Sequence, residues 1–142
     1  MPWSFGKHVR VFKVIKDHLK LEFQKRLNLS AESFDSHSAC HIQVNDRFSV
    51  RCQFAGSSFI LSCEIGDTAL WKNKLEALKE LLQGMTRKLP AILEVLSIDP
   101  ESGQLTMRRV VRKPTMLAQL EEALAEFVNT YEFLEPIYHS HT

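Results

Sequence analysis

The chain has 142 residues, of which 44% are hydrophobic and 25% charged, and its formal net charge is +1. These values are typical of one folded domain that buries a core without metals or disulfides. No apolar run approaches the roughly 18–20 residues of a membrane span, and the N-terminus lacks the apolar stretch of a cleaved signal peptide. We therefore expect a single cytoplasmic domain over residues 1–142, with an ordered core over about residues 9–138 and no membrane insertion.

The charge is unevenly distributed along the chain. Residues 1–27 carry seven Lys or Arg against Asp17 and Glu22, a local net charge of +5, whereas five glutamates and no Lys or Arg follow Thr115. The simplest interpretation is two solvated helix faces. The alternatives are a nucleic-acid footprint or a field that steers a charged partner.

The first half of the chain predicts one helix followed by three strands. From about Val9 to Leu27 the apolar residues recur at helical spacing, and three others lie off the main stripe: Val11, Val14 and Leu21. From Ala39 to Ile65 apolar and polar residues alternate, which predicts antiparallel strands with one buried face. The turns are expected at Asn45-Asp46 and at "AGSS".

The second half predicts a helix, a hairpin and a last helix. Asp67 or Thr68 is the expected N-cap of the leucine-rich helix "LEALKELLQGM". The hairpin "AILEVLSIDPESGQLTMRRVV" follows, and a helix over about residues 116–134 is expected to end before Pro136. The order is α-β-β-β-α-β-β-α, which indicates a two-layer α+β domain with helices packed on a five-stranded, mainly antiparallel sheet.

The residues that usually carry chemistry form no recognisable site. Cys40, Cys52 and Cys63 fall on the apolar phase of their strands, so we expect small buried side chains rather than metal ligands or disulfides. No catalytic or phosphate-binding motif is present. The expected strands also lack the exposed aromatic pairs that stack bases. We expect no enzymatic activity, no cofactor, no metal and no nucleic-acid partner.

The first arm of the hairpin is apolar on both faces. Leu93 and Val95 point one way and Ile92, Leu96 and Ile98 the other, although a strand with one wet face should alternate. Either a segment of the same domain covers the second face, or a second copy of the chain does.

These elements resemble the class I type III secretion chaperones, the Tir-chaperone (CesT-like) family. "SSFILSCEIGD" is similar to the family's third strand and exit turn, and "LEALKELLQGM" to its second helix. "LSIDPESGQLTMRRVV" is similar to its last two strands, and "QLEEALAEFVNTYEFL" to its final helix. One departure is the pI near 7.8, since members are usually acidic.

The resemblance implies a cytoplasmic bacterial homodimer that binds the N-terminal segment of one or a few secreted effectors in extended form. Such a chaperone keeps that segment soluble and secretion-competent and delivers it to the secretion apparatus. The implied dimer interface comprises Leu78, Leu82, Met85, Leu93 and Val95. The implied effector-binding groove comprises Val11, Val14, Leu21, Val44 and Phe48. The alternatives are a small regulatory or nucleic-acid-binding module that uses the basic first helix and, last, an unrecognised enzyme or ligand carrier.

Overall fold

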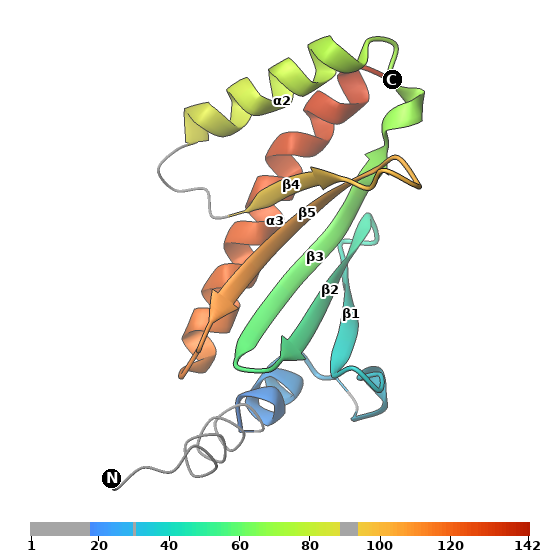
Figure 1. Ribbon diagram of the computed structural model, residues 1–142. Helices are drawn as coiled ribbons and strands as arrows, with labels where there is room; N and C mark the ends of the chain where they lie inside the picture. Colours follow the sequence, from blue (N-terminus) through green and yellow to red (C-terminus); the bar gives the residue numbers. More distant parts are fainter. Residues whose placement is uncertain (1–17, 30, 89–93) are drawn as a thin grey trace, which may run out of the picture. The chain divides into compact units, whose positions relative to one another are not determined.

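The computed structural model describes residues 18–29, 31–88 and 94–142 (Figure 1). Residues 18–26 are helical, and the strands and helices that follow confirm the expected α-β-β-β-α-β-β-α order. The elements are η1 (Ala31–Ser33), β1 (Ala39–Val44), β2 (Phe48–Ala55), β3 (Ser58–Asp67), η2 (Thr68–Leu70), α2 (Lys74–Lys88), β4 (Val95–Ile98), β5 (Gln104–Arg112) and α3 (Leu117–Ser140). The strands form one sheet in the order β1-β2-β3-β5-β4.

Two compact units make up the chain, and each is described by itself. The first contains the chain up to Leu61 together with Val110–Leu124, and the second contains Ser62–Arg109 and Ala125–Thr142. Strands β3 and β5 and helix α3 contribute residues to both units.

In the first unit the strands bury alternate residues around three aromatic rings. Phe23 lies with its ring centroid 5.9 Å from that of Phe54 and 5.3 Å from that of Phe59. Cys40 and Cys52 are directly opposed partners of β1 and β2, and both are buried, as the alternation predicts. The turn between these strands places Asn45 and Asp46 at positive φ, where short polar side chains are tolerated best.

In the second unit a buried guanidinium joins three elements. The Nη1 atom of Arg109, on β5, lies 3.4 Å from Glu94 Oε1 and 2.5 Å from Glu126 Oε2 on α3. The Glu94 side chain is fully buried, whereas that of Glu126 is 44% exposed. Because Glu94 immediately precedes β4, this ion pair fixes the start of that strand against β5 and α3.

The N-terminus of α2 differs from expectation. Asp67 caps the short η2, where its Oδ1 accepts a hydrogen bond from the backbone N–H of Ala69 at 2.9 Å. Helix α2 begins after Asn73, whose Oδ1 accepts from the N–H of Glu76 at 3.2 Å. The expected N-cap at Asp67 or Thr68 was wrong for α2 because an extended link through Trp71 separates the two helical segments.

The expected helix end before Pro136 was also wrong, since α3 continues to Ser140 with Pro136 inside it. Contacts beyond the proline hold the last turn in place. The hydroxyl of Tyr138 donates to the carbonyl of Asp67 at 2.7 Å, and His141 Nε2 lies 2.5 Å from Glu80 Oε2. These contacts offset the backbone hydrogen bond that proline cannot make.

Gly66 gives a direct test of the packing of Tyr138. A methyl group at Gly66 would overlap the Tyr138 ring, so we expect Gly66→Ala to lower the free energy of unfolding by about 1–3 kcal/mol, measured by urea denaturation. In a Tyr138→Ala background the same change should cost much less, because the ring is gone. Equal costs in the two backgrounds would contradict the proposed overlap.

Replacing Arg109 by Met should destabilise the protein by about 3–5 kcal/mol, because it removes a guanidinium that lies beside the buried Glu94 carboxylate. Adding Glu94→Leu should recover most of this loss, since an apolar pair then replaces the two buried ionic groups. Urea denaturation of the single and double variants measures both effects. No recovery in the double variant would show that Arg109 stabilises the fold in another way.

Candidate functional site

Helix α2 has one apolar side that is buried and another that the described residues leave exposed. Ala77, Leu81 and Gly84 are buried, whereas Leu75 is 74% and Leu82 63% exposed. The exposed side, which we call the α2 apolar face, follows helical spacing and is formed by Leu75, Leu78, Leu82 and Met85, of which Leu78 and Met85 are half-buried. Exposed leucines at this spacing form a continuous strip along the helix.

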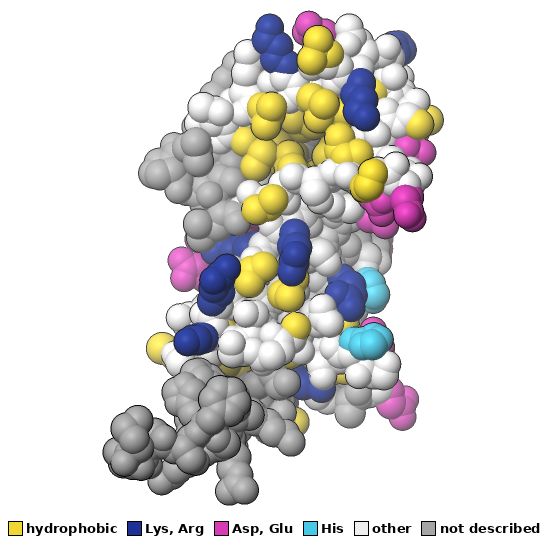
Figure 2. Space-filling model, in the orientation of Figure 1, with side chains coloured by type: hydrophobic (Ala, Val, Ile, Leu, Met, Phe, Trp, Pro, Cys, Tyr) yellow, Lys and Arg dark blue, Asp and Glu magenta, His cyan; other side chains and the backbone are white. Residues whose placement is uncertain are grey.

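Strand β4 adds an exposed apolar side chain and an open edge to the same unit. Val95 is 64% exposed, and its cross-strand partner on β5 is Arg108. Because β4 ends the strand order, one row of its backbone N–H and C=O groups has no neighbouring strand among the described residues. Figure 2 shows apolar side chains gathered on the face that carries α2 and β4.

This exposure has a substantial energetic consequence. Full burial of one large aliphatic side chain is worth roughly 1.5–3 kcal/mol, so several together favour association. Contiguous apolar patches of this kind are uncommon on proteins that remain monomeric. The α2 apolar face and β4 therefore have the character of an interface.

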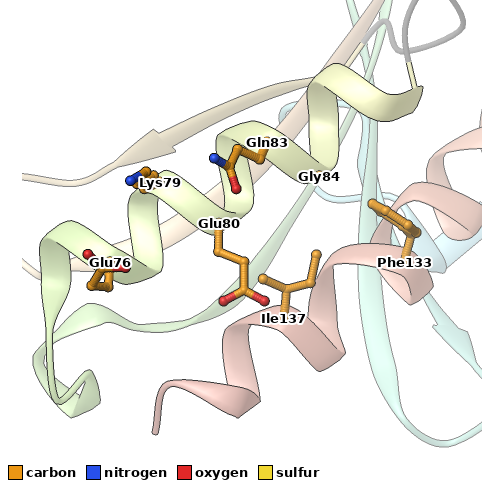
Figure 3. A pocket seen from close by; sticks show the side chains of 7 residues that line it. All are labelled: Glu76, Lys79, Glu80, Gln83, Gly84, Phe133 and Ile137. Atoms are coloured by element: carbon orange, nitrogen blue, oxygen red, sulfur yellow. The ribbon is translucent and has the colours of Figure 1, made fainter.

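A groove of about 510 Å³ separates α2 from α3 (Figure 3). Phe133 and Ile137 of α3 form its apolar floor, and Gly84 lets the helices approach, since a Cβ there would lie 3.0 Å from Ile137 Cδ1. The charged and polar side of the groove comes from α2: Glu76, Lys79, Glu80 and Gln83. In Figure 3 the Glu80 side chain points toward Ile137. This groove combines an apolar floor with a charged rim, which suits a side chain rather than a metal ion.

The residues of the implied effector-binding groove lie in the first unit. Leu21 is 55% exposed on the helical residues 18–26, on the side away from the buried Leu19 and Phe23. Val44 and Phe48 are cross-strand partners of β1 and β2, and only 8% of Phe48 is exposed. The structure thus brings Val44 and Phe48 together on the core face and leaves Leu21 available to a partner. Val11 and Val14, like Leu93 of the implied dimer interface, lie outside the described residues.

The thiols of Cys52 and Cys63 are poor nucleophiles and poor ligands in this environment, whereas the hydrogen bond with Cys52 lowers the pKa of Cys40. The hydrogen bond with Cys40 and burial raise the pKa of Cys52, and burial raises the pKa of Cys63 to about 12. A thiol that stays protonated neither attacks a substrate nor binds a metal. Across the described residues no three His, Cys, Asp or Glu side chains converge into a metal site. None of the helices described there combines the length and apolarity that crossing a membrane requires.

The expected site residues did not include several that contribute to the α2 apolar face and to the groove between α2 and α3. The spacing of Leu75 from Leu78 and Leu82 would have placed it on the same exposed strip. Gly84 within a leucine-rich helix was a sign of close helix packing. Nothing local could indicate that Phe133 and Ile137 would meet it, because they are about fifty residues away in the chain.

Comparisons with known proteins identify the relatives of this fold. No curated protein matched the chain. Among solved structures, the HopA1–SchA chaperone–effector complex gives a TM-score of 0.67 at 17% identity, covering 87% of this chain and 94% of that chain. The ExsC–ExsE complex gives 0.66 at 16% identity, covering 87% and 92%. The ExoU–SpcU complex from the type III secretion system of Pseudomonas aeruginosa gives 0.62 at 15% identity, covering 82% and 94%.

At such low identity these structures establish a shared fold. The family follows from a separate comparison, in which the model of the Tir chaperone protein (CesT) family matches residues 19–135. That range includes every strand, α2 and most of α3. The chain therefore belongs to the Tir chaperone protein (CesT) family.

Proposed function

We propose that this protein is a type III secretion chaperone in the bacterial cytoplasm. It binds the N-terminal segment of one or a few effectors in extended form, keeps that segment soluble and delivers it to the secretion apparatus, with no catalytic step and no cofactor. The observation that carries the proposal is the family match over residues 19–135. The HopA1–SchA and ExoU–SpcU structures, which are complexes of a chaperone-like fold with a second protein, support it.

Two physical features of the chain suit this role. Strands β1 and β4 end the sheet, so an extended client segment can add a strand to an open edge through backbone hydrogen bonds. The exposed Leu21 offers an apolar contact beside the sheet of the first unit. Because the client segment is ordered only on binding, part of the interaction free energy offsets its lost conformational entropy.

We further propose that the protein acts as a homodimer through the α2 apolar face and β4. Leu78, Leu82 and Met85 on α2 and Val95 on β4 then meet their copies, with Leu93 preceding that strand. Support comes from the exposed fractions of Leu75, Leu82 and Val95, which a monomer would leave in water. A two-fold axis lets one such surface cover itself.

Leu82→Asp tests the dimer. A carboxylate at the interface would be desolvated at a cost of about 3 kcal/mol or more, so we expect the dissociation constant to rise by over about a hundredfold and light scattering to report a monomer. Met116→Asp is the matched control, since Met116 is 61% exposed and lies in the other unit. A monomeric wild-type chain at micromolar concentration, or a dimeric Leu82→Asp variant, would contradict the proposed interface.

Leu21→Asp tests the client contact. When the chain is co-expressed with the N-terminal segment of a candidate effector from the same genome, we expect a stable complex with the wild type and about tenfold weaker binding with the variant. The dimer should persist, because Leu21 belongs to the first unit. Met116→Asp again serves as the control. Failure of every secreted candidate to form a complex, with unchanged secretion after deletion of the gene, would refute the chaperone function.

A further inference from the structure

The open face of the sheet in the first unit has an unusual composition. Strands β1, β2, β3 and β5 alternate buried and more exposed residues, so one set of side chains faces away from the aromatic core. Within the first unit that set contains no Asp or Glu; Glu64, farther along the same face of β3, belongs to the second unit. Its members are His41, Gln43, Ser49, Arg51, Gln53, Ala55, Ser58, Ile60, Val110 and Arg112. We call this surface the basic sheet face.

Its arginines make no close ion pair among the described residues. Arg51 lies opposite His41 across β1 and β2, and its Nη1 donates to Gln53 Oε1 at 2.9 Å. The nearby Asp35 has its pKa lowered mainly by backbone N–H groups of Ala39 and His37, with Arg51 contributing least. Arg112 is exposed at the end of β5. Both guanidinium groups therefore keep donors available to a partner.

Apolar side chains lie between the charged ones. The backbone N–H of Lys113 donates to the carbonyl of Ser57 at 2.8 Å, which aligns the end of β5 with the start of β3. From this pair, three residues back along β5 lead to Val110 and three residues forward along β3 lead to Ile60. In an antiparallel pair these two residues lie side by side, and Val110 is 41% exposed. In Figure 2 Lys, Arg and His side chains lie over the strands with apolar side chains between them.

We propose that the basic sheet face receives an acidic, extended segment of the client protein, a proposal that rests on the chaperone function above. Charge complementarity identifies the occupant. Arginine forks bind carboxylates through paired, charge-assisted hydrogen bonds, and in the first unit the face offers two of them with no carboxylate among its strand residues. A segment in which acidic and β-branched residues alternate matches the two kinds of side chain that this face presents.

A nucleic acid fits this face less well. Proteins that hold single strands stack the bases on exposed aromatic rings, and the outward positions of these four strands carry no Phe, Tyr or Trp, and a single imidazole, that of His41, in the first unit. A protein segment also uses Ile60 and Val110, which a phosphate backbone does not. We therefore assign the face to a peptide and treat nucleic-acid binding as an outcome that the experiment must separate.

Fluorescence anisotropy with synthetic probes tests the assignment on the full chain. The probe is an unstructured peptide in which Glu alternates with Val, compared with a Lys–Val peptide and with single-stranded DNA and RNA. We expect the Glu–Val peptide to bind best and to weaken as NaCl rises from about 50 mM to about 200 mM. The double variant Arg51→Glu/Arg112→Glu should bind it at least about tenfold more weakly.

The matched control is Lys72→Glu/Lys74→Glu, which makes the same change in net charge at exposed positions of the second unit. It should leave the affinity within about twofold of the wild type. Equal weakening by the two double variants, no preference for the acidic peptide, or tighter binding of DNA or RNA would overturn the proposal. Circular dichroism and urea denaturation exclude misfolding, and Arg51→Gln/Arg112→Gln should give an intermediate loss.

The experiment also separates this inference from the chaperone function. If the function fails, the wild-type chain forms no complex with co-expressed effector segments. If only this inference fails, that complex forms and the Arg51→Glu/Arg112→Glu variant retains it. If this variant loses the complex and the Lys72→Glu/Lys74→Glu control retains it, the result supports both the chaperone function and the assignment of the basic sheet face.

Discussion

The arrangement of the second unit depends on one buried guanidinium. Arg109 reaches from β5 to Glu94 at the start of β4 and to Glu126 on α3, so a single cation joins the edge strand, its neighbour and the helix. A buried charge is tolerated only when its partners are in place, and the contact therefore penalises any other register of β4. Since that register sets which side of β4 carries Val95, the exposure of Val95 depends on this ion pair.

The apolar residues of α2 lie in two environments. One side packs on the chain itself, where Gly84 admits the aromatic ring of Phe133 and the side chain of Ile137. The other side, with Leu75 and Leu82, finds no cover within the described chain. The apolar surface of α2 is wider than its contacts within the described residues, since Glu76, Lys79, Glu80 and Gln83 occupy the polar side and Leu75 and Leu82 stay exposed.

Much of this structure could be predicted from local patterns. The alternation in β1 to β3 placed Cys40, Cys52 and Cys63 in the core, and the turn at Asn45 and Asp46 followed from residues that accept positive φ. The cap of α2 at Asn73 was missed because Asp67 caps an intervening short helix, and both residues carry the same capping signal.

Features that depend on distant residues could not be predicted. The continuation of α3 past Pro136 relies on Tyr138 meeting Asp67, seventy-one residues away. The burial of Arg109 could not be predicted either, since nothing in the neighbouring sequence indicates that Glu94 and Glu126 converge on it. Helical spacing grouped the leucines of α2 on one apolar side without showing which of them are exposed, and the assignment of the interface and groove residues still rests on the family resemblance and stays a prediction.

A dimer formed through the exposed strip on α2 would make the stability of this protein depend on its abundance. If a second copy covers Leu75 and Leu82, the free energy of that burial is gained only by chains that have met, and mass action decides how many have. The apparent melting temperature then rises with protein concentration. Chains are then least stable at low concentration, which is the condition just after their synthesis begins. At that stage proteases remove the largest fraction of them.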